Sequence, residues 1–299
     1  MFYQEAPYFT GDKIKILKPK YEKFCKKNAQ FFLAAMRKAF SAFAWGSSRF
    51  NVDTLKVQMI KLPTKDDTID FEFMETFIAE LEAQRIAELE AQRIAELSAY
   101  LKVSGFDNYE LSVEEQNALQ EYETLEWDLF NLEALFGKST RGKRLKSADR
   151  ISGELPFVTA GEANEGISAY IINKVEVFEK NTTTIDMFGS AKYRNYKYGA
   201  DDHIAVVHTE NIPMKASIFL TSSIHKAAHT GKFDYGHNFY AKDADELDIM
   251  LPAKNGQPNY DVMDLLISAV QKLVIKDVVK YSDAKISATK QVIQEKGEF

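Results

Sequence analysis

The residues best suited to chemistry in this sequence are cations spaced to neutralise phosphates. The run from Lys138 to Arg150, KSTRGKRLKSADR, carries six bases against one acid. Each Lys or Arg that pairs with a nucleic-acid phosphate releases condensed counterions, which favours binding of such a run to a polyanion. A solvated loop rich in lysine and arginine has the same composition, so charge alone leaves both interpretations open. The candidate phosphate contacts are Lys138, Arg141, Lys143, Arg144 and Lys146.

Three further segments combine hydrogen-bonding side chains with aromatic or small residues. AKYRNYKYG interleaves cations with tyrosines, as expected of a surface that faces a nucleic acid, although an amphipathic strand on a solvated face has the same pattern. Its candidate contacts are Lys192, Tyr193, Arg194 and Lys197. The loop from Thr159 to Gly166 offers close approach and, in Asn164, an amide able to read a base edge, or else it is a turn that only organises the fold. The loop GKFDYGHN adds Lys232, Tyr235 and His237.

Motifs for catalysis or metal binding are weak. NIPM at Asn211 to Met214 has only one of the two prolines, and lacks the aromatic residue, of the NPPY-like tetrapeptide that a DNA aminomethyltransferase needs. The sequence contains no GxSxG elbow and no P-loop. His225 and His229 have the i, i+4 spacing of a metal pair, but neither an HExxH glutamate nor a cysteine pair accompanies them. We therefore expect no catalytic residue, no metal site and no cofactor bound by this chain.

Composition bounds the class of protein. A chain of 299 residues with 45% hydrophobic content predicts two packed domains. Cys25 is the only cysteine, and there is neither a signal-peptide pattern nor a run of 18 apolar residues, which predicts a cytoplasmic protein. The net charge of −6 argues against nucleic-acid binding at first, but residues 72–133 hold sixteen acids and three bases. The rest of the chain therefore carries a net charge of +7.

A long helix is expected over residues 71–101, which lack Gly and Pro. Within it the octad IAELEAQR occurs at Ile78–Arg85 and Ile86–Arg93 and begins again at Ile94. At 100° per residue, one octad lengthens a helix by about 12 Å and rotates the later part of the helix by about 80°. The apolar pair therefore precesses around the helix instead of forming a heptad seam, and the repeat behaves as a ruler. Replication slippage tolerated in a solvent-exposed helix is the alternative explanation.

The remaining segments predict an α+β fold. Residues 151–250 contain β-branched runs such as those around Val175 and Ile204, punctuated by glycines, as expected of a strand-rich domain. A capping-box sequence, SVEE at Ser112, predicts an acidic helix, and an apolar stripe from Met263 to Tyr281 predicts a second long helix that requires a partner.

An internal repeat relates the two halves of the chain. FFLAAMRKA at Phe31–Ala39 parallels FLTSSIHKA at Phe219–Ala227. Leu62-Pro63 parallels Leu251-Pro252, and the segment at 70–74 parallels the one at 259–263, each time at an offset of 188 or 189 residues. Each copy runs directly into a long helix, so the chain contains two copies of one module.

With these segments in order, the sequence resembles the DNA specificity subunits of type I and related type IIB and IIG restriction-modification systems. The likeness rests on ELPFVTAGEANEGISAYI at Glu154–Ile171, Phe188-Gly189, the helix ending in HKA, and Leu-Pro followed by Asn-Tyr-Asp-Val-Met at 259–263. It implies target recognition domains alternating with spacer helices that form an antiparallel coiled coil. The implied segments are 1–68 for the C-terminal part of a first recognition domain, 69–103 for the central spacer, 104–124 for an acidic linker, 125–258 for the second recognition domain and 259–299 for the distal spacer.

The resemblance also implies partners. They are double-stranded DNA, a methyltransferase (modification) subunit that binds S-adenosylmethionine, and a restriction subunit, with catalysis left to the partner subunits. It further implies a chain truncated at its N-terminus, so that a second copy or fragment completes the first recognition domain. In this family, variation of short repeats in the central helix changes the gap between two DNA half-sites, so that one octad of about 12 Å should change the gap by roughly three to four base pairs. The alternative is a coiled-coil scaffold or inactive fragment without DNA readout.

Overall fold

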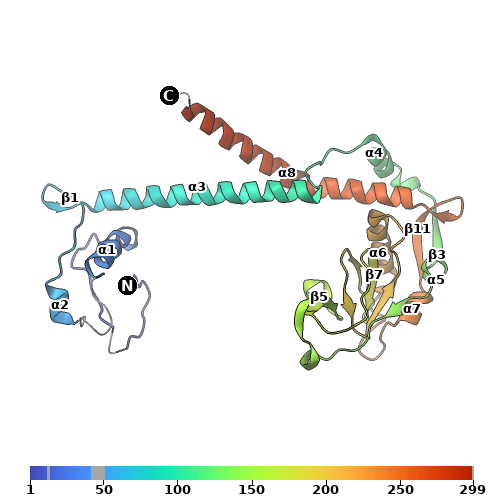
Figure 1. The fold of residues 1–299 in the computed structure, drawn as a ribbon. Coiled ribbons are helices and arrows are strands. Elements are labelled where there is room, and N and C mark those ends of the chain that lie inside the picture. Colours follow the sequence, from blue (N-terminus) through green and yellow to red (C-terminus); the bar gives the residue numbers. More distant parts are fainter. Residues whose placement is uncertain (12–13, 42–50, 298–299) are drawn as a thin grey trace. The chain divides into compact units, whose positions relative to one another are not determined.

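The computed structural model describes residues 1–11, 14–41 and 51–297 (Figure 1). The chain divides into two compact units, which are described separately. Unit 1 comprises Met1–Tyr100 and Ser282–Phe299, and unit 2 comprises Leu101–Tyr281. The recognition domain expected at 125–258 lies within unit 2, which also includes α4 (Val113–Gln120) and the first part of α8 (Tyr260–Gly297).

Unit 2 is built from three small sheets and a central helix, as the predicted α+β class requires. A four-stranded sheet has the order β4-β10-β7-β8, and two three-stranded sheets have the orders β6-β5-β9 and β12-β11-β3. The strands are β3 (Trp127–Asn131), β4 (Thr140–Arg141), β5 (Ser152–Val158), β6 (Ile167–Ile171), β7 (Thr182–Asp186), β8 (Ala191–Arg194), β9 (Gly199–Ala200), β10 (Ile204–Val207), β11 (Asp248–Lys254) and β12 (Gln257–Pro258). The helices besides α4 and α8 are α5 (Leu132–Phe136), α6 (Met214–Ala228) and α7 (Ala241–Asp245), and short 3-10 turns lie at Tyr122–Thr124, Ser147–Asp149 and Ala163–Gly166.

The four-stranded sheet is covered on both faces. Alternate residues of a strand point to opposite faces, and in β10 both sets are apolar. Ala205 and Val207 join the cluster formed with α6, whereas Ile204 and Val206 pack in a second cluster with Val158 and Tyr198. The helix α6 lies against β7 and β8 on the first face (Figure 1). Burial on both faces explains why β10 is a continuous apolar run in the sequence instead of an alternating one.

Unit 1 reproduces part of unit 2 in detail, which confirms the predicted repeat. Its elements are α1 (Lys26–Ala39), α2 (Val52–Lys56), β1 (Thr64–Lys65), β2 (Thr68–Ile69) and most of α3 (Phe71–Ser104). The β1–β2 hairpin pairs Thr64 with Ile69, and the β11–β12 hairpin pairs Ala253 with Pro258 in the equivalent register. In both hairpins the residue before the helix, Asp70 or Asn259, caps the helix with its side-chain oxygen. Met74 and Met263 then occupy the same fully buried position.

The octads lie in one uninterrupted helix, as predicted. In α3, which has 34 residues, Gln84 donates to Glu88 and Gln92 donates to Glu96, so the two octads repeat one i, i+4 contact. Ile86 and Leu89 are exposed, as expected of an apolar pair that precesses around a helix. The second long helix, α8, has 38 residues, so both helices have the length that a coiled coil requires. None of the described helices combines the length and apolar character needed to cross a bilayer.

A buried ion pair fastens α4 to α8 within unit 2. The α4 capping box forms as predicted, because Ser112 and Glu115 exchange hydrogen bonds of 2.7 and 3.2 Å. Lys272 of α8 also donates to Glu115, at 2.9 Å. Burial alone raises the pKa of this carboxyl, but hydrogen bonds from Ser268, Lys272 and the Ser112 backbone outweigh it and lower the pKa of Glu115 to about 2.

Replacing Glu115 is expected to destabilise unit 2 in a pH-dependent way. A carboxyl whose pKa is lowered on folding stabilises the native state above its unfolded pKa, near 4.5, and this contribution is lost as the pH falls from there to about 2. We expect Glu115→Gln to lower the free energy of unfolding at pH 7 by about 3 kcal/mol, and by much less near pH 2. Urea unfolding at both pH values measures the effect. The exposed neighbour variant Glu114→Gln is the control, and equal effects of the two variants would contradict the assignment.

Candidate nucleic-acid interface

Most of the candidate residues gather at one end of the four-stranded sheet. Asp186, the last residue of β7, pairs with Ile204 at the start of β10, and Ile185 pairs with Ala191 at the start of β8. Arg141, the last residue of β4, lies opposite Ala205. All four strands therefore share one end, which we call the Asp186 end.

The basic segment leaves the sheet at the Asp186 end. Gly142 is buried directly against the carbonyl of Ala200, where a side chain would overlap it. The Lys143 amide donates to Ala200 at 3.0 Å, and the Leu145 amide donates to the carboxylate of Asp201 at 3.2 Å. The backbone is thus fixed while the cations stay in solvent. Arg141, Lys143, Arg144 and Lys146 are exposed here, and Lys138 is exposed on the other side of β4.

The β5–β6 loop, residues 159–166, closes at the same end. The Thr159 amide donates to the carbonyl of Gly166 at 2.8 Å, and Thr159 itself is half-buried. Asn164 and Glu165 both adopt left-handed backbone conformations, with φ of 49° and 55°, and both side chains are exposed. Gly166 has a φ of +79° and lies against Thr159, so that a side chain could not be placed there. The loop is therefore a tight, outward-pointing turn whose tip carries an amide and a carboxylate.

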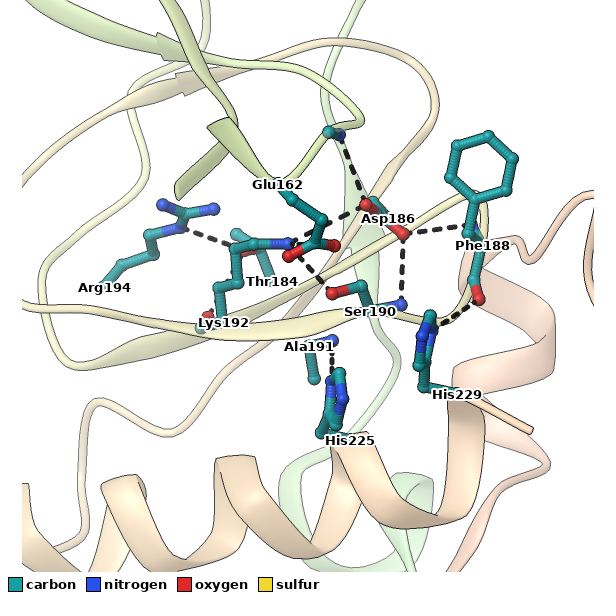
Figure 2. Close-up of polar contacts among 11 residues, drawn as sticks. Glu162, Thr184, Asp186, Phe188, Ser190, Ala191, Lys192, Arg194, His225 and His229 are labelled. Carbon is teal, nitrogen blue, oxygen red and sulfur yellow. Dashed lines mark hydrogen bonds and ion pairs between the residues drawn. The ribbon is translucent and has the colours of Figure 1, made fainter. Parts of the chain in front are cut away.

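The turn between β7 and β8 connects the loops at this end. The buried carboxylate of Asp186 accepts the amides of Phe188 and Ser190, each at 3.0 Å, and the amide of Gly161 at 3.4 Å (Figure 2). On the other side of the turn, His229 Nδ1 bonds the Phe188 carbonyl at 3.2 Å. One carboxylate thereby joins the turn to the 159–166 loop, and the C-terminal end of α6 supports it.

Lys192 is held inside this network. Its ammonium group donates to Ser190 at 2.9 Å and to Glu162 at 3.1 Å, and lies 3.9 Å from Asp186. Only 16% of its side chain is exposed. A hydrogen bond with the Ser190 hydroxyl has the largest effect in lowering the pKa of Glu162, and Lys192 lowers this pKa further. The carboxyl of Glu162 is therefore charged and tied to the turn (Figure 2). The structure places Lys192 at the Asp186 end but with its charge already paired.

The third candidate loop is packed against the same turn. The Phe239 amide donates to the carbonyl of Met187 at 2.9 Å, and the rings of Phe188 and Tyr235 meet edge to face at 5.3 Å. Asp234 accepts the amides of Gly236 and His237, which shapes the loop. The three candidate side chains of this loop, Lys232, Tyr235 and His237, are exposed.

Three residues of the AKYRNYKYG segment lie elsewhere, and the expectation of an exposed cation–tyrosine face is wrong for one of them. Arg194 is only 1% exposed, and its guanidinium donates to Thr184 and Tyr196 at 2.9 Å each, with the Tyr198 ring 5.9 Å away. Its neighbour Tyr193 is half-buried and donates to Asn181, while Lys197 is exposed and pairs with Glu179. Both residues lie toward the end of the sheet opposite Asp186. Tyr193 pairs with Thr183, near the start of β7, and Lys197 follows it in the chain beyond the end of β8.

The histidine pair on α6 supports the turn. His225 and His229 stack with ring centroids 4.8 Å apart, and Nδ1 of His225 accepts the Ala191 amide at 3.1 Å. Among the described residues, the one group of three side chains close enough to share a cation is Asp201, Asp202 and His203. Sequence reasoning missed both this group and Asp186, whose only signal is an aspartate immediately before the Met-Phe-Gly-Ser turn.

The sequence is similar to proteins of one known family. The sequence matches the family described as "Type I restriction modification DNA specificity domain" over residues 1–91 and 124–295. It is 25% identical over 280 residues to the type II restriction enzyme specificity subunit S.BcgI of Heyndrickxia coagulans, covering 92% of this chain and 75% of the relative.

Two solved structures are also similar. The S subunit of a type I restriction-modification system from M. genitalium shares 15% identity, with a TM-score of 0.42 and coverage of 89% of this chain and 70% of that one. The HsdS subunit of Thermoanaerobacter tengcongensis shares 15% identity, with a TM-score of 0.36 and coverage of 90% and 67%. The family match spans well over half of the sequence, and the chain therefore belongs to the family of DNA specificity (S) subunits of restriction-modification systems.

Proposed function

We propose that unit 2 is a target recognition domain that reads double-stranded DNA at the Asp186 end of its sheet. The observation that carries the proposal is the meeting of an exposed basic segment with two exposed polar loops at one end of one sheet. Four strands at about 4.8 Å spacing cover roughly 14 Å, comparable to the major-groove width of about 12 Å. The three segments can therefore contact one groove and its flanking phosphates together.

The two kinds of contact have different roles. Phosphate contacts set affinity and register, whereas contacts to base edges set sequence preference. We assign Arg141, Lys143, Arg144 and Lys146 to phosphates, because their side chains are exposed and their backbone is fixed. We assign Asn164, Tyr235 and His237 to bases, with Thr159 and Lys232 beside them. Arg194 is not assigned to DNA, because it is buried. We assign no central contact to Lys138, Tyr193 or Lys197, because they lie away from the Asp186 end.

Neutralising two cations of the basic segment should weaken DNA binding in a salt-dependent way. We expect Lys143→Gln with Arg144→Gln to lower affinity for any duplex at least tenfold at low salt, and to reduce the slope of log affinity against log salt by about 2. Fluorescence anisotropy with a labelled duplex at several salt concentrations measures both quantities. Lys174→Gln with Lys180→Gln removes the same charge from exposed positions at the opposite end of the sheets and is the control. An equal loss in both variants would contradict the proposed face.

We propose further that the long helices recruit the catalytic subunits. On α8, the exposed apolar side chains of Val270, Leu273, Val274 and Val278 offer a docking surface. In the described part of unit 2, the NIPM segment lies at the N-terminal end of α6, with Pro213 as the N-cap and Met214 as the first helical residue. Methyl transfer would then belong to a partner methyltransferase that carries S-adenosylmethionine, and cleavage to a restriction subunit. A protein that acts on cellular DNA in this way would reside in the cytoplasm.

Unit 1 offers a place for one further partner. Residues 59–65, MIKLPTK, resemble β11, DIMLPAK, whose residues 248–252 pair with β3. In the described residues of unit 1, no strand pairs with 59–63, and Ile60 and Leu62 are half-buried where Ile249 and Leu251 are fully buried. We propose that a strand similar to β3, from a second copy or another polypeptide, pairs there.

A further inference from the structure

The tip of the 159–166 loop presents two side chains that the protein does not use. Asn164 and Glu165 are exposed, and among the described residues neither side chain has a hydrogen-bonding partner. Their consecutive left-handed conformations are unfavourable for residues with a Cβ and persist only where surrounding contacts impose them. An amide matches the N6 and N7 edge of adenine, and a carboxylate accepts from N4 of cytosine. The tip is thus strained and polar, and its polar groups are available to a ligand.

The contacts that impose this geometry converge on one buried carboxylate. Beyond the Thr159–Gly166 closure, the loop is tied down at Gly161, which donates to Asp186 Oδ2, and at Glu162, which binds Lys192. Lys192 in turn lies 3.9 Å from the same Oδ2 atom and donates to Ser190. The Asp186 side chain is only 5% exposed. Figure 2 shows Glu162 and Lys192 close to Asp186 and Ser190.

The two oxygens of Asp186 have separate tasks. Oδ1 accepts the amides of Phe188 and Ser190 and so shapes the β7–β8 turn. Oδ2 faces the Gly161 amide and the Lys192 ammonium, which are both donors. The first oxygen belongs to the fold of the turn, and the second connects that turn to the loop.

We propose that Asp186, with Lys192, is a positioning residue that holds the 159–166 loop so that Asn164 and Glu165 determine the base preference of unit 2. This inference rests on the proposed DNA readout and deepens it. It also reassigns Lys192 from a candidate DNA contact to a support of the loop. Neither Asp186 nor Lys192 touches DNA in this arrangement, so their replacement should change sequence preference without changing the number of phosphate contacts.

The variant Asp186→Asn separates the two tasks. Asparagine keeps the size of the side chain, and its Oδ1 still accepts the two turn amides. Its Nδ2 places a donor opposite the Gly161 amide and the Lys192 ammonium, so the connection to the loop is lost. The full chain would be tested by selection from a pool of random-sequence duplexes, with anisotropy on the selected and on a scrambled duplex. We expect the ratio of selected to scrambled affinity to fall about tenfold or more, while the scrambled affinity and its salt slope stay unchanged.

Five further variants, one of them a control, separate positioning from stability. Lys192→Gln should lose preference as Asp186→Asn does, and Lys192→Arg should retain most of it because the cation is kept. Asn164→Gly and Glu165→Gly remove the tip side chains from residues whose conformation glycine adopts readily, so these two tip variants should change base preference without lowering the temperature of thermal unfolding. Asp277→Asn, at an exposed position of α8, matches the charge change and should leave preference unaltered.

The outcomes distinguish this inference from the proposed function. If the unmodified chain selects no sequence, the proposed readout fails. If it selects a sequence and Asp186→Asn keeps the same preference, or Lys192→Gln lowers the salt slope by about 1 as a phosphate contact would, the positioning role is overturned. If Asp186→Asn unfolds unit 2, the test passes to Asn164→Gly and Glu165→Gly. An unchanged base preference in both of these variants also overturns the inference.

Discussion

Deleting the octad Ile86–Arg93 should move the recognised half-sites closer by roughly three to four base pairs. Each octad adds about 12 Å to the length of α3 and rotates the later part of the helix by about 80°. At a rise of 3.4 Å per base pair, a length of about 12 Å corresponds to roughly three to four base pairs of B-DNA. Methylation of the original motif should fall to background, and a motif with a shorter gap should appear. The measurement is sequencing of methylated bases in cells that lack the gene and receive the variant with the partner subunits.

A matched substitution separates length from sequence in this experiment. Replacing Ile86–Arg93 by eight unrelated helix-forming residues keeps the length and phase of α3, and the octad side chains are largely exposed, so the original motif should persist. Loss of the motif in this control would show that the octad serves as a binding surface instead of a spacer. An unchanged gap after the deletion would support replication slippage in a tolerant helix.

Replacing Arg194 should lower the free energy of unfolding of unit 2 without altering its phosphate contacts. Arg194→Ala removes a fully buried side chain, its two hydrogen bonds and its contact with Tyr198, and we expect a loss of about 2–4 kcal/mol in the free energy of unfolding. Arg194→Met fills most of the space and should lose about half as much. Urea unfolding measures the stability of both variants.

The DNA-binding behaviour of these variants distinguishes a buried support from a surface contact. Under conditions where Arg194→Ala is folded, its salt slope for duplex binding should equal that of the unmodified chain. A normal stability together with a salt slope reduced by about 1 would contradict the buried role and return Arg194 to the DNA-facing set.

The sequence predicted local structure well where one signal dominated. Composition predicts the octad helix, and a four-residue pattern predicts the Ser112 capping box. The Leu-Pro dipeptide that occurs in both halves of the chain predicts the repeated hairpins. In each case the residues that decide the structure are neighbours in the chain. The family resemblance, which the comparisons confirm, depended on the order of such local segments.

The candidate site was harder to predict because its geometry depends on pairing between distant strands. Lys192 and Arg194 belong to a cation–tyrosine pattern, but β8 pairs with β7, and the sheet β6-β5-β9 covers the face that carries both side chains. Asp186 looks like an ordinary turn residue in the sequence. Its role becomes visible only in the folded chain, where the amide of Gly161, 25 residues earlier, lies within hydrogen-bonding distance of its carboxylate.

The pattern of methylated bases in the source cell shows whether this chain directs a restriction-modification system to a specific DNA sequence. Genomic DNA from cells with and without the gene would be sequenced by a method that detects methylated bases. We expect one bipartite or asymmetric motif to be methylated in the first sample, to lose its methylation in the second, and to regain it when the gene is restored. An unchanged set of methylated motifs would contradict the claim.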